Sequence, residues 1–391
     1  MSPFARSKLP DVGTTIFTVM SRRARELGAI NIGQGFPDYE IDPLLGELVA
    51  GAIAAGHNQY APMEGAIELR AAIADKLAAI YGTRVDPDAE ITVTLGATEA
   101  LYSVIQAVVS AGDEVIIFDP AYDSYEPAVR LAGARCIRLP LEPPAFRYDW
   151  DRVRASLSER TRLVILNTPH NPTCTAASRA DLEALAACLR GRDTLVLSDE
   201  VYEHVLFDGR AHASILTHEE LRARGFAVFS FGKTLHATGW RVGYAIAPPA
   251  LTGELRKVHQ FNTFSIANPL QQAIAVYLKR KPQAWRELGA FFQAKRDRLR
   301  AGLAGSGLRL PPAEGTFFQL LDYSGIADEG DVAFAEALLT EAGVATIPLT
   351  PFYEQAPALR FVRVCIAKRD ATLDQALERL RSFCKRRLAL R

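Results

Sequence analysis

The sequence has 391 residues, 49% of them hydrophobic, so the chain can bury a large core and is long enough for one large domain and a smaller one. Its 45 basic and 45 acidic residues cancel, and the basic cluster at Lys385 to Arg387 is typical of a solvated helix end, so no nucleic-acid partner is indicated. No uninterrupted apolar run is long enough to cross a bilayer, which argues against a membrane protein.

The five cysteines indicate a reducing environment. Their number is odd, and none stands in a Cys-x-x-Cys or Cys/His spacing that would predict a metal site. Residues 2–13 include charged side chains and lack the apolar core of a signal peptide. We therefore expect a cytoplasmic protein with free thiols and no bound metal.

Residues 90 to 247 alternate short apolar runs with segments of helical period. This alternation predicts an α/β fold, in which a mostly parallel, mixed sheet is covered by helices on both faces. Helices are expected at 99–111 and 178–189. The predicted strands are 91–95, 114–118, 163–166, 194–197, 227–229 and 242–247.

After Pro248 the helical period dominates, and a smaller α+β unit is expected to follow. We assign residues 40–275 to the large domain, and residues 1–39 and 276–391 to the small one. The helix at 282–303 is long enough to bridge the two. Further helices are predicted at 251–260, 269–280, 331–341 and 372–386, and further strands at 317–321, 344–347 and 359–366.

Polar residues follow directly after five of the predicted strands. Open parallel sheets bind their ligands beyond the carboxyl ends of the strands, so these residues are expected to meet at one edge. The alternative is five unrelated loops, which would need five coincidences. The segments are 96–98, 119–122, 167–171, 199–202 and 230–233.

The segment from Ser230 to Tyr244, SFGKTLHATGWRVGY, predicts the chemistry of this edge. Lys233 can form an imine with an aldehyde, while Ser230 and Arg241 can hold phosphate oxygens. Pyridoxal phosphate carries both groups. The alternative is a surface loop with a solvated lysine, but the apolar run before Ser230 and the nearby glycines argue against it.

Three further positions fit the same cofactor. Asp199 follows an apolar run and needs a cationic partner if it is buried, for which the ring nitrogen of the cofactor would serve; otherwise it caps a turn. The amides of Ala97 and Thr98 and the threonine hydroxyl can bind phosphate where a helix begins, and a plain N-cap role for Thr98 is compatible with this.

The cofactor ring needs a flat neighbour and hydrogen bonds to its phenolic oxygen. Tyr122 can lie against the ring, although an aromatic residue after a turn is as often part of the core. Asn171 and Tyr202 can donate to the ring oxygen, or either can satisfy the backbone of its own loop.

The substrate side is predicted from an arginine and three aromatic residues. Arg363 stands inside an otherwise apolar strand, where it needs an anion, either a substrate α-carboxylate or an internal carboxylate. The candidate substrate contacts Phe17, Phe36 and Tyr39 are aromatic, and no second cation is placed for a side-chain carboxylate. A neutral, bulky amino acid is therefore the expected amino donor.

Nearly the whole chain resembles the class I and II aminotransferases, pyridoxal phosphate enzymes of fold type I, and is most similar to the methionine aminotransferases and the kynurenine–oxoglutarate transaminase group. The lysine segment with Gly-Trp-Arg-x-Gly is the most restrictive motif. The other segments that carry the resemblance are Asn31-Ile-Gly-Gln-Gly-Phe-Pro-Asp38, Asn58-Gln-Tyr-Ala-Pro62, Asn171-Pro-Thr, Ser198-Asp-Glu-Val-Tyr202 and Arg363.

The resemblance implies roles for individual residues. Gly35, Asn171 and Arg363 match contacts to the substrate carboxylate. Tyr60 matches a tyrosine that reaches the cofactor phosphate of a neighbouring subunit, which implies a homodimer with shared active sites. Cys174 departs from the family, in which many members carry glycine at that position. The residues that match cofactor contacts are Lys233, Asp199, Tyr202, Asn171, Ser230 and Arg241.

The expected activity is a ping-pong transamination in which Lys233 both anchors the cofactor and moves the proton. The donors expected are methionine, phenylalanine, histidine or kynurenine, with a 2-oxo acid as acceptor. One alternative is a cysteine-conjugate β-lyase with the same lysine and cofactor. A cofactor-sensing transcription regulator is a remote alternative, since no helix-turn-helix module precedes Asn31.

Overall fold

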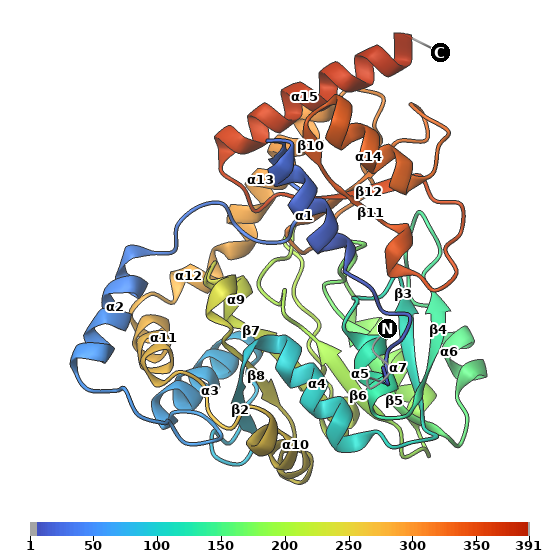
Figure 1. Ribbon diagram of the computed structural model, residues 1–391. Coiled ribbons are helices and arrows are strands. Elements are labelled where there is room, and N and C mark those ends of the chain that lie inside the picture. The colour runs from blue at the N-terminus through green and yellow to red at the C-terminus, as the bar shows by residue number, and fades with distance from the viewer. Residues whose placement is uncertain (1–5, 390–391) are drawn as a thin grey trace.

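The computed structural model describes residues 6–389, which form a larger lower part and a smaller upper part in Figure 1. Helix α13 (Leu288–Leu303) leads into the upper part, where it packs against the last helix, α15 (Asp370–Ala389). The sequence predicted one helix over 282–303. The structure has two, because the chain leaves the helical path at Glu287 between α12 (Gln283–Arg286) and α13.

A seven-stranded sheet forms the centre of the larger part. All of its strands run in one direction except β8, which is antiparallel to both neighbours, so the sheet is mixed and mostly parallel, as predicted. In spatial order the strands are β2 (Ile91–Thr94), β8 (Gly243–Ile246), β7 (Gly225–Ser230), β6 (Leu195–Asp199), β5 (Thr161–Asn167), β3 (Glu114–Asp119) and β4 (Arg135–Pro140).

The sequence did not predict strand β4, which forms one edge of the sheet. Its residues are mostly half-exposed, and Arg135 and Arg138 interrupt its apolar residues. An edge strand needs only one neighbour and can carry charged side chains, so it lacks the continuous apolar run that marks a central strand. The other six strands of this sheet lie where the apolar runs predicted them, within a few residues.

The two faces of the sheet bury separate clusters of side chains. Along β3, Val115 and Ile117 belong to one cluster, while Ile116 and Phe118 belong to the other. This alternation follows from the two-residue period of a strand. The first cluster is covered by α4 (Gly96–Val108), α5 (Tyr125–Leu131) and α10 (Pro249–Asn262). The second is covered by α3 (Ile67–Tyr81), α6 (Trp150–Ser156), α7 (Arg179–Leu189) and α8 (Glu219–Arg222).

The first helices of the chain were not predicted. Helix α3 buries the charged residues Arg70 and Lys76 together with its apolar ones, so its sequence shows no clean polar face. It packs against α11 (Asn268–Arg280), which also contacts α2 (Pro43–Ala54). These three helices form the left side of the larger part in Figure 1.

The upper part contains a three-stranded antiparallel sheet of β11 (Ile347–Pro348), β12 (Phe361–Cys365) and β9 (Phe318–Asp322). Beside it, β1 (Ile30–Asn31) pairs in parallel with β10 (Val344–Ala345). The sequence predicted a single strand over 344–347. It is divided at Thr346 because its two halves pair with different sheets.

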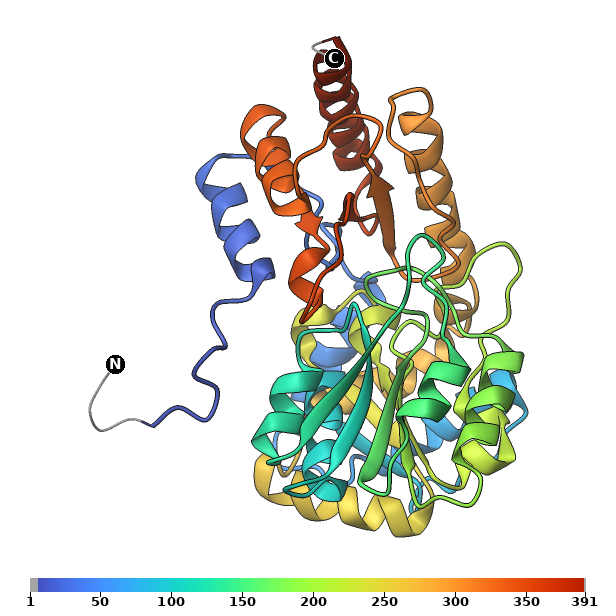
Figure 2. The ribbon, with the colours of Figure 1, turned by 90° about the vertical axis from the view of Figure 1, so that its right-hand side faces the viewer.

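The N-terminal region also lies with the upper part. Helix α1 (Ile16–Glu26) contacts β10 and β11, and Figure 2 shows the segment before it extending away from the body of the molecule. In that segment Asp11 pairs with Arg130 of α5 at 2.5 Å. Helix α14 (Asp331–Glu341) completes the upper part. The division into domains at residues 39 and 275 stays a prediction.

Within residues 6–389, none of the helices is both long and apolar enough to cross a membrane. The same residues contain no group of three or more His, Cys, Asp or Glu side chains placed to hold a metal ion. All five cysteines are free, and four of them are buried.

Candidate active site

A cavity of about 130 Å³ lies at the carboxyl edge of the large sheet. Strand β2 runs in the same direction as β7, because both are antiparallel to β8. The strands β2, β3, β5, β6 and β7 therefore all end at this edge, and the segments that follow them begin there. Every predicted cofactor contact except Tyr60 lines the cavity. The lining residues are Ala97, Thr98, Leu101, Tyr122, Asn167, Asn171, Asp199, Val201, Tyr202, Ser230, Lys233 and Arg241.

One end of the cavity combines a helix N-terminus with a guanidinium. Helix α4 begins at Gly96, and Arg241 donates to the Thr98 hydroxyl at 3.3 Å. Arg241 has a left-handed φ of 54°, and a Cβ on Gly243 would come within 2.8 Å of the Ala97 nitrogen. The close approach of β8 to the start of α4 therefore needs glycine at position 243. Amide groups at a helix start, next to an arginine, favour an anion.

Asp199 stands at the end of β6 and is 4% exposed. The Tyr125 hydroxyl donates to its Oδ2 at 2.6 Å, and the Val201 amide donates to its Oδ1 at 3.3 Å. Burial raises the pKa of Asp199 to about 6, although the Tyr125 hydrogen bond and the nearby Lys233 oppose this shift. Its carboxylate is therefore mostly ionised at neutral pH and suited to a cationic ligand.

Lys233 lies in the short helix α9 (Phe231–Thr234), directly after β7. Its Nζ donates to the Gly35 carbonyl at 3.4 Å and lies 5.1 Å from the centre of the Phe317 ring and 5.7 Å from that of Tyr202. Burial lowers the pKa of Lys233 to about 8, with Cys365 opposing the shift and the arginines 241 and 363 adding to it. A lysine with such a pKa is partly neutral near neutral pH, as a nucleophile or base must be.

Arg363 stands in the middle of β12 and is 1% exposed. It donates from Nη1 to Asn171 Oδ1 at 2.5 Å and from Nη2 to the Gly33 carbonyl at 3.2 Å, while its Nε has no partner. Among residues 6–389 no carboxylate lies within 4 Å of it, so the structure does not provide the internal ion pair considered above as an alternative. The guanidinium lies 3.8 Å from the centre of the Phe318 ring.

Of the other predicted substrate residues, Gly35 contacts Lys233 and Phe17 lies near Arg363, whereas Phe36 and Tyr39 contact other side chains. Gly35 has no space for a side chain, because a Cβ there would come within 2.6 Å of Phe318. Phe17 lies 5.1 Å from the Arg363 guanidinium. Phe36 is 41% exposed and covers Lys368, and Tyr39 contacts His236 at 3.4 Å. None of the three aromatic residues lines the cavity itself.

Tyr60 is 82% exposed and packs edge-on against Phe264, away from the lining of the cavity. Cys174, where many relatives have glycine, adopts a left-handed φ of 66°. Glycine takes this conformation without strain. The loop after Asn171 therefore keeps the backbone shape that a glycine would favour.

Two polar residues of the site received no individual role from the sequence, although Asn167 stands in the predicted polar segment 167–171. Asn167 accepts from the Asn171 amide at 2.9 Å and donates to the Asp199 carbonyl at 3.0 Å, so it links two loops of the site. Tyr125 stands three positions after Tyr122, and this spacing was the one available indication that both could face the same way. The partner of its hydroxyl, Asp199, is 74 residues away in sequence.

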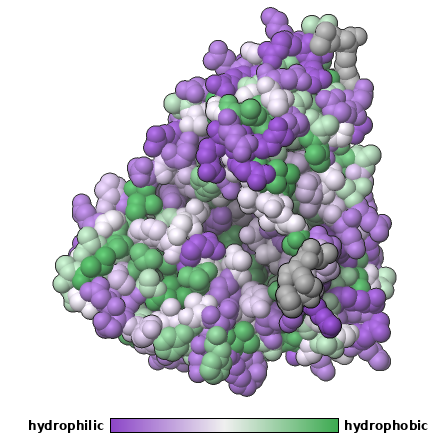
Figure 3. All heavy atoms as spheres, viewed as in Figure 1, coloured by the Kyte–Doolittle hydropathy of each residue, from purple (hydrophilic) through white to green (hydrophobic). Residues whose placement is uncertain are grey.

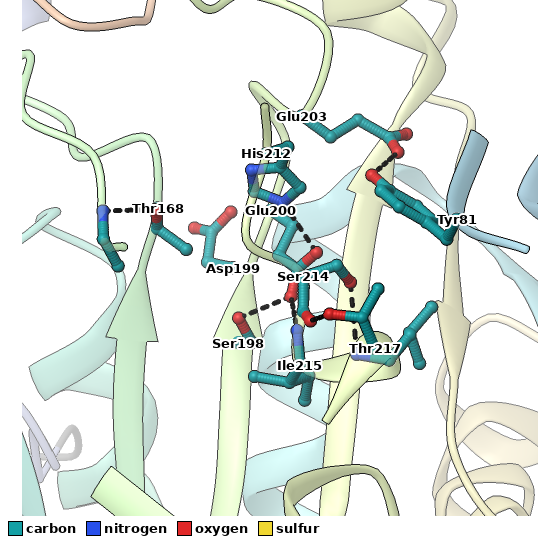
Figure 4. A network of polar contacts seen from close by, with 12 residues as sticks. Tyr81, Thr168, Ser198, Asp199, Glu200, Glu203, His212, Ser214, Ile215 and Thr217 are labelled. Atoms are coloured by element: carbon teal, nitrogen blue, oxygen red, sulfur yellow. Dashed lines mark hydrogen bonds and ion pairs between the residues drawn. The ribbon is translucent and has the colours of Figure 1, made fainter. Parts of the chain in front are cut away.

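Two buried acids follow the cavity residues on the same loop and point away from the cavity. Figure 4 shows the first, Glu200, which accepts from Ser198 at 2.8 Å and from the Ile215 amide at 3.0 Å and pairs with His212 at 2.8 Å. Beyond this network, a cleft of about 940 Å³ is lined by His212 and Tyr81 but contains none of the predicted site residues. The chemistry is therefore assigned to the smaller cavity.

The second acid, Glu203, directly follows Tyr202. It pairs with Lys76 of α3 and accepts from the hydroxyls of Tyr81 at 2.6 Å and Tyr244 at 3.2 Å. Burial alone would raise the pKa of Glu203, but His204 and Lys76 outweigh it and hold that pKa well below its usual range. Burial lowers the pKa of Lys76, but its contact with Glu203 opposes that shift. The short contact between the ionised Glu203 and Lys76 ties the Tyr202 loop to α3.

The fold and the site together define a pyridoxal phosphate enzyme of fold type I, and the chain belongs to the class I and II aminotransferase family, whose model matches residues 29–380. It is 51% identical to a methionine aminotransferase of Escherichia coli over 97% of this chain and 98% of that protein. The solved structure of an Escherichia coli methionine aminotransferase has a TM-score of 0.95, with 97% of this chain and 99% of that one covered.

Two further relatives have other names. A probable N-succinyldiaminopimelate aminotransferase of Mycobacterium tuberculosis is 36% identical over 97% of this chain and 98% of that protein. A kynurenine–oxoglutarate transaminase of Dictyostelium discoideum is 32% identical, with 94% of each chain covered. The chain is thus a transaminase of a family that depends on pyridoxal phosphate.

The buried pair of Lys76 and Glu203 gives a prediction for stability. Lys76→Met leaves a buried carboxylate without its cation, so the free energy of unfolding should fall by about 3 to 5 kcal/mol, as measured by urea unfolding. Lys257→Met is the matched control, since Lys257 pairs with Glu254 at 2.7 Å on the surface and should lose less than about 1 kcal/mol. Equal losses in the two variants would contradict the assignment.

Proposed function

We propose that this aminotransferase transfers the α-amino group of a neutral, bulky amino acid to a 2-oxo acid by a ping-pong mechanism. Methionine is the first donor to test, followed by phenylalanine, histidine and kynurenine. The observation that carries the proposal is that Lys233 and Arg363 meet at the same cavity. Lys233 lines the cavity, and Arg363 donates to Asn171, which also lines it. The names of the relatives support the choice of donors.

The residues of the cavity fit pyridoxal phosphate. The start of α4 with Ala97 and Thr98, together with Ser230 and Arg241, would hold the phosphate, since Arg241 has no carboxylate within 4 Å in the part of the chain that is described. Asp199 has no cationic group within 4 Å in the same part of the chain and would pair with the protonated ring nitrogen of the cofactor. The Tyr122 ring would lie against the cofactor, and Asn171 and Tyr202 would donate to its ring oxygen.

Bound pyridoxal phosphate supplies an aldehyde that takes up the amino group and a ring that accepts electrons. The chain itself supplies the proton acceptor. With a pKa of about 8, roughly a tenth of Lys233 is neutral at pH 7. Its Nζ can then accept a proton from the α-carbon of the amino acid and donate it to the carbon that the aldehyde of the cofactor supplied.

Arg363 would bind the α-carboxylate of the donor. Its Nε has no hydrogen-bond partner and its guanidinium lies over the Phe318 ring. Within residues 6–389 it has no carboxylate closer than 4 Å, although Asp123 acts on it from farther away. Such a guanidinium favours a carboxylate that it can grip with two hydrogen bonds. Phe17 lies beside it, and aromatic neighbours suit a donor with an uncharged side chain.

The assembly is proposed to be a cytoplasmic homodimer with shared sites. Tyr60, Phe261 and Phe264 are 82%, 86% and 43% exposed, and Figure 3 shows apolar side chains gathered over the side of α2, α3 and α11. Exposed apolar residues in such number favour burial against a partner. In such a dimer, the exposed Tyr60 of each subunit would reach the cofactor phosphate bound in the other subunit. The free cysteines fit a reducing compartment.

Lys233→Ala tests the proposed catalytic role. Transamination of methionine should fall by at least about 10³-fold, because the variant lacks both the anchor and the proton acceptor. Borohydride treatment and peptide mass spectrometry should find a phosphopyridoxyl group on Lys233 of the wild type. The exposed Lys385→Ala should behave as the wild type. A label on another lysine would refute the assignment.

Arg363→Lys tests the carboxylate site. Loss of the planar, two-pronged donor should lower kcat/KM for methionine by about 10- to 100-fold, while borohydride labelling of Lys233 stays complete. A panel of donors should rank neutral, bulky amino acids above aspartate. Pyruvate, ammonia and thiol released from a cysteine conjugate without added 2-oxo acid would instead favour the β-lyase. A strong preference for aspartate would contradict the proposed donor class.

The shared site can be tested by complementation. Tyr60→Ala and Lys233→Ala should each be nearly inactive, but a heterodimer of the two should regain about half of the wild-type activity, because one of its sites has an intact Lys233 and an intact Tyr60 from the partner. Two affinity tags allow the mixed dimer to be purified. No recovery in a dimer of twice 42.8 kDa would show that each chain uses its own Tyr60.

A further inference from the structure

Tyr125 occupies a position between the two groups proposed to receive the cofactor ring. It begins helix α5, and its side chain is 3% exposed. Its hydroxyl donates to Oδ2 of Asp199 at 2.6 Å, and its ring packs edge-on against Tyr122 with the ring centres 5.7 Å apart. The two neighbours come from different segments, since Asp199 is the last residue of β6 and Tyr122 lies in the loop after β3. Tyr125 therefore fixes both with one side chain.

The hydrogen bond to Tyr125 is the shorter of the two that the Asp199 carboxylate accepts. The other, from the Val201 amide to Oδ1, measures 3.3 Å. No lysine, arginine or histidine lies within 4 Å of Asp199 in residues 6–389. A hydrogen bond to a buried, ionised group is stronger than one between neutral groups, because the carboxylate has few other donors.

The remaining charged and titratable groups around Asp199 come from several elements. Lys233 of α9 favours the carboxylate, and the adjacent Glu200 disfavours it. The tyrosines 122, 148 and 202 also lie near enough to interact with Asp199, and each is raised in pKa by burial, so all three are neutral at physiological pH. Among the side chains that the structure describes, Tyr125 and Lys233 are thus the two that stabilise the ionised form of Asp199.

We infer that Tyr125 is a positioning residue, whose hydroxyl keeps the Asp199 carboxylate ionised and oriented for the ring nitrogen of the cofactor. The inference rests on the proposed role of Asp199. It assigns no contact between Tyr125 and the cofactor itself, since Tyr125 does not line the cavity. The hydroxyl acts through the carboxylate, and the ring supports Tyr122.

The direction of the effect follows from the charges. Burial raises the pKa of Asp199 to about 6, and the Tyr125 hydrogen bond works against that rise. Without the hydroxyl, the pKa of Asp199 is higher still, so more of the acid is neutral at pH 7. A neutral acid does not pair with a protonated ring nitrogen. Binding of the cofactor ring should then require a higher pH.

Tyr125→Phe tests the inference, because it removes the hydroxyl and keeps the ring. The probe is pyridoxamine phosphate, which has no aldehyde and therefore binds without a bond to Lys233. Its affinity for full-length protein freed of cofactor is measured by calorimetry from pH 5.5 to 9. In the variant, the fall in affinity at low pH should begin at a higher pH, with about three- to tenfold weaker binding at pH 7 and equal binding at pH 9.

Matched variants separate this result from a loss of structure. Tyr323→Phe removes another buried hydroxyl, which donates to the Glu329 carbonyl at 2.9 Å in the upper part, and its profile should follow the wild type. Tyr125→Leu should show the same shift as Tyr125→Phe, which keeps the test available if one variant folds poorly. Titration of the probe itself is common to every profile, so differences between profiles report the protein.

Asp199→Asn distinguishes failure of the inference from failure of the proposed function. It should bind the probe weakly across the whole range and lose the pH dependence that belongs to Asp199. If Asp199→Asn is weakened but Tyr125→Phe follows the wild type at every pH, the inference about Tyr125 is wrong. If Asp199→Asn binds as tightly as the wild type, the proposed role of Asp199 fails and the inference fails with it.

Discussion

Two buried charges that form no close ion pair determine the character of this structure. Asp199 and Arg363 are 4% and 1% exposed, and neither lies within 4 Å of an opposite charge among residues 6–389. Each forms a hydrogen bond with a neutral group: the Tyr125 hydroxyl donates to Asp199 at 2.6 Å, and Arg363 donates to the Asn171 amide oxygen at 2.5 Å. An unpaired buried charge costs several kcal/mol. A fold that tolerates two of them around one site is suited to ligands that carry the complementary charges.

Two other buried acids near the cavity, Glu200 and Glu203, differ from Asp199 in having close partners. Glu200 and Glu203 lie on the same loop as Asp199, but each has an imidazole or ammonium group as a partner and further hydrogen bonds from neighbouring elements. Fully satisfied polar networks of this kind rigidify the backbone that carries them. The loop therefore alternates between side chains that anchor it and side chains that face the cavity, and the anchoring contacts hold the unpaired Asp199 in place.

The sequence predicted features that depend on neighbouring residues and missed those that depend on distant ones. Central strands such as β5 were found because burial on both faces produces a continuous apolar run, whereas the edge strand β4, with its arginines, produces none. The divided strand at Thr346 depends on which strands lie alongside, and no local pattern records that. Most of the cavity was predicted, because its residues directly follow strands of one sheet. Tyr125 and Lys76 were missed because their partners lie 74 and 127 residues away.

The division of the site between two parts of the molecule limits what it can accept. Lys233 lies in α9, directly after β7 of the large sheet, and Arg363 belongs to the small antiparallel sheet of the upper part. The contacts that join them are short: Arg363 reaches Asn171 of the lower part, and Lys233 reaches the Gly35 carbonyl on the segment after β1. Gly35 permits this approach, because a side chain there would collide with Phe318, the ring on which Arg363 stacks. An α-amino acid carries its α-hydrogen and its carboxylate on one carbon, so the proposed reaction requires the lysine that takes the proton and the arginine that binds the carboxylate to lie close together across the boundary between the parts. The glycine and the asparagine at this boundary allow that approach, and the proposed carboxylate site makes no use of the side chain of the donor.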